Sequence, residues 1–125
     1  SNLKILKFPD GLDAECFRFS ALETAWINAK LPNEKEHVTP YIWKRKKKFK
    51  IDILKSKKDY SQYRWTLDNK DDLNLVKIIY KNLYSKKNNF FMKDIIKFIN
   101  KNPKIRNLNN KHIGRENYKK ILNEK

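Results

Sequence analysis

The sequence of 125 residues has one cysteine, Cys16, and no apolar run close to the roughly 20 residues that a membrane-spanning helix requires. A single cysteine excludes an internal disulfide framework and a cysteine-based zinc site. Its neighbours Ala14 and Phe17 favour a buried structural thiol over a reactive one. The first residues are polar and do not form a signal peptide. We therefore expect a protein of the reducing cytoplasm, and the start at Ser1 suggests that the natural N-terminus lies elsewhere.

Acidic residues are also scarce, because 14 Asp and Glu stand against 30 Lys and Arg, which gives a net charge of +16. Such a balance raises the expectation of nucleic acid or membrane headgroups as partners. Lysine, however, outnumbers arginine five to one, and Asn and Ile are abundant. These three residues share A/T-rich codons, and a nucleic-acid reader is expected to use more arginine. Composition favours genome bias over nucleic-acid binding and leaves both readings open.

A dense basic run covers residues 43–50 (WKRKKKFK). With aromatic residues at both sides of the charges, it is a candidate patch for a phosphate backbone. The alternative, which we favour, is a lysine-rich helix end that complements the helix dipole and needs no partner.

Hydrophobic periodicity predicts an α/β fold with few strands and much helix. Alternating apolar residues predict strands at 12–19, 49–54 and 63–67. Helical spacing predicts helices at 20–30, 34–46, 92–100, 115–122 and from Asp68 to Tyr84, with 102–114 irregular. A capping box of Ser20 and Glu23 is expected to start the first helix, and Asp68 is expected to cap the helix that runs to Tyr84.

The apolar positions of these helices predict which side chains face inward. They are Leu22, Trp26 and Ala29 in the first helix, Leu73, Val76, Ile79, Tyr80 and Leu83 before Tyr84, and Phe91, Ile95, Ile96 and Ile99 around 92–100. Two or three strands make a small sheet with exposed edges, which proteins normally cover or pair. The sequence therefore predicts that a partner, such as an N-terminal half of the same chain, is missing.

Three carboxylates, Asp10, Asp13 and Glu15, lie within six residues around Gly11. If residues 12–17 form a strand, Asp13 and Glu15 share one face, because side chains alternate. Such a pair can hold Mg²⁺ or bind sugar hydroxyls. The alternative is a solvated strand face after a turn.

Two histidines and one further aspartate complete the polar candidates. His37 beside Glu36 can serve in acid–base chemistry or as a hydrogen-bond donor to a substrate, or it can be a capping or core histidine. No second histidine stands at metal-ligand spacing, and His112 is expected to be structural.

Asp68 lies at a predicted strand end, where ligands gather in open α/β sheets. As a plain N-cap it would contribute about 1 kcal/mol. As an Mg²⁺ ligand it is incomplete, since the ion combines one or two carboxylates with substrate phosphates.

Four segments together resemble a known family. Residues 8–15 (FPDGLDAE), 19–26 (FSALETAW), 36–42 (EHVTPYI) and 64–68 (RWTLD) with 72–73 (DL) are similar to the C-terminal half of SpsF-type spore-coat polysaccharide biosynthesis proteins. Those proteins belong to the acylneuraminate/KDO cytidylyltransferase superfamily. The resemblance extends over nearly the whole chain, and the third and fourth motifs, EHVTPYI and RWTLD, are the most specific.

The resemblance implies a Rossmann-like glycosyltransferase-A type fold, homodimers, and transfer of CMP from CTP to an acidic or related sugar with Mg²⁺. It matches Asp68 to the metal-binding aspartate. It matches Asp10, Gly11, Asp13 and Glu15 to the segment that lines the sugar side of the cleft. More loosely, it matches Glu36, His37 and Arg64 to polar positions near the substrate.

The family's N-terminal half, with its triphosphate-binding loop and its second metal aspartate, has no counterpart in this sequence, which has only two glycines. Phosphoryl chemistry depends mainly on positioning and charge neutralisation. We therefore expect residues 1–125 to be the C-terminal portion of a cytidylyltransferase-like domain, inactive alone, with Mg²⁺ bound only together with the missing half. No catalytic residue is assigned. The alternatives are a lysine-rich nucleic-acid-binding module and an accessory subunit of a separate nucleotide-binding chain.

Overall fold

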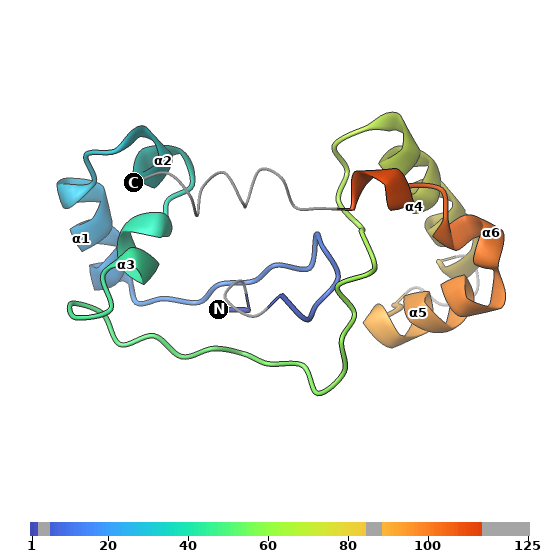
Figure 1. The fold of residues 1–125 in the computed structure, drawn as a ribbon, viewed down its shortest axis with the longest axis horizontal. Coiled ribbons are helices and arrows are strands. Elements are labelled where there is room, and N and C mark those ends of the chain that lie inside the picture. Colours follow the sequence, from blue (N-terminus) through green and yellow to red (C-terminus); the bar gives the residue numbers. More distant parts are fainter. Residues whose placement is uncertain (3–5, 85–88, 114–125) are drawn as a thin grey trace. The chain divides into compact units, whose positions relative to one another are not determined.

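The computed structural model describes residues 1–2, 6–84 and 89–113 (Figure 1). Two compact units divide these residues: unit 1 contains 1–2 and 14–55, and unit 2 contains 6–13 and 56–113 apart from 85–88. The elements in chain order are α1 (Phe19–Asn28), α2 (Pro32–Glu36), α3 (Pro40–Lys44), α4 (Lys70–Leu83), α5 (Met92–Lys101), α6 (Pro103–Arg106) and the 3₁₀ turn η1 (Asn110–His112). The first three helices belong to unit 1 and the others to unit 2 (Figure 1).

The described part of the chain is helix-rich, and the strands predicted at 12–19, 49–54 and 63–67 are wrong. Among these residues, strand pairing is reduced to one isolated parallel bridge between Asp10 and Arg64. The pairing ends there because the chain turns at once: Gly11 has φ +94°, and the Leu12 amide donates to the Pro9 carbonyl. A strand also needs a neighbour for its backbone groups, and alternation of side chains cannot supply one. The α/β expectation therefore holds only in the coarse sense of helices combined with extended segments.

Residues 1–2 lie against two extended segments of unit 1. The Leu54 amide donates to the Ser1 carbonyl at 2.8 Å, and the Ala14 amide donates to Oδ1 of the buried Asn2 at 2.9 Å. Residues 1–2 thus connect Ala14 to Leu54 by single hydrogen bonds, without a β-sheet between the two segments.

Helix α1 begins one residue earlier than predicted, and the Ser20–Glu23 capping box is absent. Its N-cap is Arg18, which makes no side-chain cap bond, so Ser20 lies inside the first turn. The buried residue of the helix is Ala25, 2% exposed, whereas Trp26 is 79% exposed. The inward position predicted for Trp26 is wrong. The small side chain of Ala25 therefore lies on the buried face of α1.

The single helix predicted at 34–46 is two short helices. Pro32 and Pro40 each stand at a helix start, where the missing proline N–H is no loss. A proline inside one continuous helix would remove a hydrogen bond and clash with the preceding turn. The break at residues 37–39 includes Val38 with φ +65°.

Cys16 is exposed, so the prediction of a buried thiol is also wrong.

Unit 2 is built around α4 and α5. Its buried apolar residues are Tyr63, Leu75, Ile79 and Ile99, with Tyr60, Trp65, Leu83, Phe90, Ile95, Ile96, Phe98 and Ile105 partly buried against them. Helix α5 begins at Met92 as predicted and ends one residue later. In α4, Leu75 was missed, while Leu73, Tyr80 and also Phe91 before α5 are exposed, contrary to the prediction. Residues 102–113, which were predicted to be irregular, contain helix α6 and the 3₁₀ turn η1. The helix predicted at 115–122 lies outside the described residues.

The start of α4 differs from the prediction in a way that affects the candidate site. The N-cap is Asn69, whose Oδ1 accepts the Asp72 amide at 3.0 Å. Asp68 precedes the cap, so its carboxylate is not committed to the helix amides.

Candidate functional site

Three carboxylates of unit 2 surround one guanidinium, that of Arg64. Nε and NH2 of Arg64 donate to the two oxygens of Asp72 at 3.1 and 3.0 Å. NH1 lies 3.2 Å from Asp10 Oδ2, and NH2 lies 2.8 Å from Asp68 Oδ2. The backbone bridge between Asp10 and Arg64 explains why residues 54 positions apart meet here. We call these four side chains, together with Asn109, the Arg64 cluster.

Asp72 is the centre of the cluster and is completely buried. Besides Arg64, its carboxylate accepts from Thr66 Oγ1 at 3.2 Å, the Asp68 amide at 3.2 Å and Asn109 Nδ2 at 2.8 Å. Asn109 also lies 2.9 Å from the Arg64 carbonyl, which ties the η1 region to the same point. Every lone pair that a buried carboxylate must satisfy therefore has a donor nearby.

These contacts keep both central groups charged. Burial by itself raises the pKa of Asp72, but hydrogen bonds from Arg64, Asn109 and the Asp68 amide outweigh it and hold the pKa well below its ordinary value. The hydrogen bond to Asp72 raises the pKa of Arg64 in turn. The pair is thus a permanent buried ion pair at neutral pH.

Asp68 is the member of the cluster that faces solvent. Its side chain is 65% exposed, against 13% for Asp10 and 10% for Arg64. A carboxylate held by an arginine at one oxygen and open to solvent can take a cation or a hydrogen-bond donor of a ligand.

Mg²⁺ can use Asp68 as one ligand only. Within the described residues, no group of three or more His, Cys, Asp or Glu is arranged to hold a metal ion. Mg²⁺ typically combines one or two protein carboxylates with substrate phosphates and water. Asp68 fits that pattern as a single contributor, and Asp10 and Asp72 are already occupied by Arg64.

Gly11 is held in place by close backbone contact. Its φ of +94° disfavours any residue with a side chain, and an added Cβ would lie 2.7 Å from the Thr66 nitrogen and the Trp65 carbonyl carbon. Only glycine lets residues 9–12 approach the segment between Arg64 and Asp68 this closely.

The predicted site residues fall into both units. Asp10, Gly11, Arg64 and Asp68 come together in unit 2, where Asp13 is exposed beside them in sequence. Their substrate roles stay predictions, because the contacts described here are internal to the protein.

Glu15, Glu36 and His37 belong to unit 1. Glu15 Oε2 accepts the Thr39 hydroxyl at 2.5 Å. Glu36 is exposed at the end of α2, and exposed His37 is the C-cap of that helix. The helix-capping alternative for His37 thus has a structural basis, and its role toward a substrate remains a prediction.

Asp72 and Asn109 were missed as site residues by sequence reasoning, in which Asp72 entered only as part of the similarity motif at 72–73. The available signal was the spacing of Asp72 from Asn69, since a cap at Asn69 turns Asp72 back toward the preceding segment.

A second pair that sequence reasoning missed lies in unit 1. The carboxylate of buried Glu34 contacts Arg45 NH1 at 2.6 Å, and the Arg45 guanidinium stacks 3.7 Å from the Tyr41 ring centre.

The Glu34 pair resembles the Arg64 cluster electrostatically. Burial raises the pKa of Glu34, but the hydrogen bonds from Arg45 and the Lys30 amide lower it below its ordinary value. One charge of the basic run is therefore used internally.

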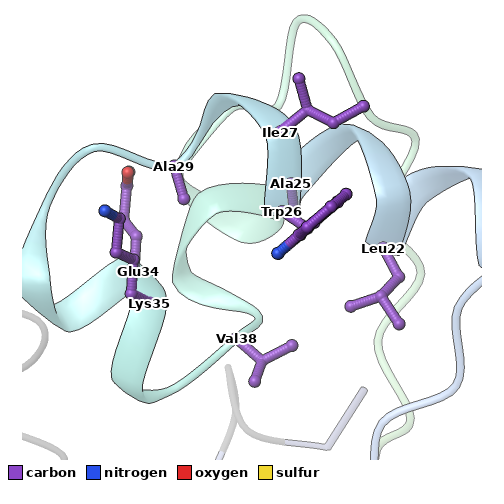
Figure 2. Close-up of a pocket in the computed structure, with 8 residues that line it drawn as sticks. All are labelled: Leu22, Ala25, Trp26, Ile27, Ala29, Glu34, Lys35 and Val38. Atoms are coloured by element: carbon purple, nitrogen blue, oxygen red, sulfur yellow. The ribbon is translucent and has the colours of Figure 1, made fainter.

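Unit 1 also contains an open, mainly apolar pocket of about 880 Å³. Figure 2 shows Leu22, Trp26 and Val38 bordering a common space. The full lining is Leu22, Ala25, Trp26, Ile27, Ala29, Glu34, Lys35 and Val38. Exposed Trp26, which was expected in the core, thus lines a surface pocket instead.

Comparison with known proteins adds one relative. Uncharacterized protein MJ1063 of Methanocaldococcus jannaschii is 35% identical to the chain over 113 residues. The match covers 89% of the chain but 45% of MJ1063, so the chain spans less than half the length of this relative. No protein-family model and no solved structure matches the chain. Within the described ranges, no helix is long and apolar enough to cross a membrane.

Proposed function

We propose that the complete protein is a nucleotidyltransferase that activates a sugar acid as its CMP derivative from CTP and releases pyrophosphate. In this proposal the chain contributes the sugar side and one metal ligand of the active site. The observation that carries it is Asp68, an exposed carboxylate held 2.8 Å from Arg64 at the start of α4. The motif resemblance independently matches the same residue to a metal-binding aspartate.

The residues of the chain have distinct parts in this reaction. Mg²⁺, when bound, would neutralise charge on the transferring phosphate. Asp68 offers its carboxylate to that ion, and Arg64 orients the carboxylate. Gly11 allows residues 9–12 to lie directly against the segment that carries both side chains. In this proposal Asp13, an exposed residue of the same segment, contacts the sugar hydroxyls.

The triphosphate must be held by residues outside this sequence. Neither Gly11 nor Gly114 lies in a glycine-rich phosphate loop. Since the reaction depends on positioning the triphosphate, we expect the 125-residue chain alone to transfer no CMP.

The test is pyrophosphate release by the chain expressed together with any coding sequence that precedes Ser1 in frame. CTP, Mg²⁺ and a panel of acidic sugars are supplied, with UTP and ATP as nucleotide controls. We expect release with CTP and at least one sugar acid, and its loss in Asp68→Asn but not in Asp71→Asn. Hydrolysis without a sugar, or equal activity of Asp68→Asn, would contradict the proposal.

The exposed lysines after α3 support a second candidate, a nucleic-acid-binding module. Lys46, Lys47 and Lys50 are all exposed. Such binding must weaken steeply with salt, by roughly 10³-fold or more between about 50 and 200 mM for six phosphate contacts. Fluorescence anisotropy with labelled duplex and single-stranded DNA measures this directly. Replacing the three lysines by glutamine should abolish true binding, whereas a shallow salt dependence argues against this function.

A further inference from the structure

The contacts of Arg64 are ordered from the interior to the surface. The buried Asp72 takes both Nε and NH2 of the guanidinium, and the remaining NH2 proton and NH1 reach Asp68 and Asp10. Because the guanidinium is planar and its donors form a rigid fork, its two bonds to Asp72 fix its orientation. The positions of the donors offered to Asp68 follow from that orientation.

Asp72 is itself held from several sides. Its amide donates to Asn69 Oδ1, and its carboxylate accepts from Thr66, the Asp68 amide and Asn109. The first turn of α4 therefore fixes Asp72, Asp72 fixes Arg64, and Arg64 fixes the exposed carboxylate.

We propose that Asp72 is a positioning residue for the nucleotidyl transfer: through Arg64 it sets the place of the Asp68 carboxylate. This inference rests on the proposed function and adds to it a residue that touches neither substrate nor metal. Three carboxylates share one guanidinium, so the cluster keeps excess negative charge, and Asp68 presents that charge to solvent. Because Asp68 is 65% exposed, its ion pair with Arg64 contributes little to stability. Its fixed geometry is therefore better explained by a use at the surface than by folding.

The first experiment needs no activity. In the 125-residue chain, the exchange rate of the Arg64 Nε–H proton is measured by NMR for the wild type, Asp72→Asn and Asp68→Asn. We expect a protected proton in the wild type and in Asp68→Asn, and exchange at least tenfold faster in Asp72→Asn. Equal protection in Asp72→Asn overturns the positioning role, whatever the reaction is.

The second experiment uses the active complete protein. Asp72→Asn should lower kcat by roughly 10²-fold, the scale of a misplaced reacting group, and raise the Mg²⁺ concentration needed for half-maximal rate, with little change in the KM for CTP. Ile79→Val, a conservative core change in the same helix, is the structural control and should change neither value. An unchanged Mg²⁺ requirement in Asp72→Asn contradicts the inference.

A milder variant covers the case in which Asp72→Asn does not fold. Thr66→Val keeps the shape of the side chain and removes one hydrogen bond to Asp72. It should speed the Arg64 Nε–H exchange several-fold and shift the Mg²⁺ requirement in the same direction. If the wild type releases no pyrophosphate, the proposed function fails, while the exchange measurement still decides whether Asp72 orients Arg64.

Discussion

Asp72 and Arg64 form a two-bond ion pair, with N–O distances of 3.1 and 3.0 Å, in which the carboxylate is completely buried and the guanidinium nearly so. Desolvating two charges is costly, and the cost is offset here only because the remaining lone pairs of Asp72 meet further donors. The pair therefore tolerates the loss of neither partner.

Asp72→Asn is expected to destabilise unit 2 by about 3–5 kcal/mol, because it leaves Arg64 buried without its main counter-charge. Asp68→Asn, at the exposed end of the same guanidinium, should change stability by less than about 1 kcal/mol. Urea denaturation followed by circular dichroism measures both. Equal losses in the two variants would show that the cluster is not organised around Asp72.

Stability should fall as the solution becomes acidic. The folded-state pKa of Asp72 lies below its unfolded value of about 3.9, so the native state keeps the carboxylate ionised where the unfolded chain takes up a proton. The contribution is complete above about pH 5 and is lost progressively as the pH drops through 4 toward the folded pKa. Urea midpoints at pH 7, 5, 4 and 3 test this. Asp72→Asn should flatten the decline, and an unchanged slope in that variant would assign the acid sensitivity to other carboxylates.

Gly11→Ala should destabilise the contact between residues 9–12 and 65–66. The positive φ alone costs roughly 1–2 kcal/mol for a residue with a Cβ, and that atom would also lie 2.7 Å from backbone. Thermal unfolding of Gly11→Ala is compared with that of Asp13→Ala, a change at an exposed position two residues away. A Gly11→Ala protein as stable as the wild type would mean that the turn can move without cost.

Substitutions at the adjacent α1 residues Ala25 and Trp26 should differ strongly in their effect on stability. Trp26→Ala removes a large side chain that is 79% exposed, so it should alter stability by no more than about 0.5 kcal/mol. Ala25→Leu forces extra volume into a buried position and should cost about 1–3 kcal/mol. Chemical denaturation distinguishes them. A large loss in Trp26→Ala would indicate that something covers the pocket of Figure 2 in solution.

Sequence reasoning succeeded where local signals agreed. The apolar spacing of residues 92–100 placed α5 within one residue, and the structure adds that Asp94 in its first turn accepts the Phe91 amide at 2.9 Å. It failed where one local signal had two meanings. Pro40 lies inside the single helix predicted at 34–46 but begins a new helix, and Asp68 was expected to be the cap that Asn69 provides.

For the candidate site, the sequence identified Asp10, Gly11, Arg64 and Asp68 as residues of interest from their motifs. It could not show that Asp10 meets Arg64, because that contact joins positions 54 residues apart through a backbone bridge. Nor could it show that Asp72, one of two adjacent aspartates, is buried while Asp71 remains accessible and pairs with Lys111 and His112.

The sequence by itself therefore determined the helix-rich character, the positions of the longer helices and the high positive charge, because these depend on residues close together in the chain. The tertiary structure decided which carboxylates are occupied by Arg64 and which one faces solvent. That outcome depends on burial and on long-range contacts, and the free energy of a charged group is set by the atoms around it, which local sequence does not specify.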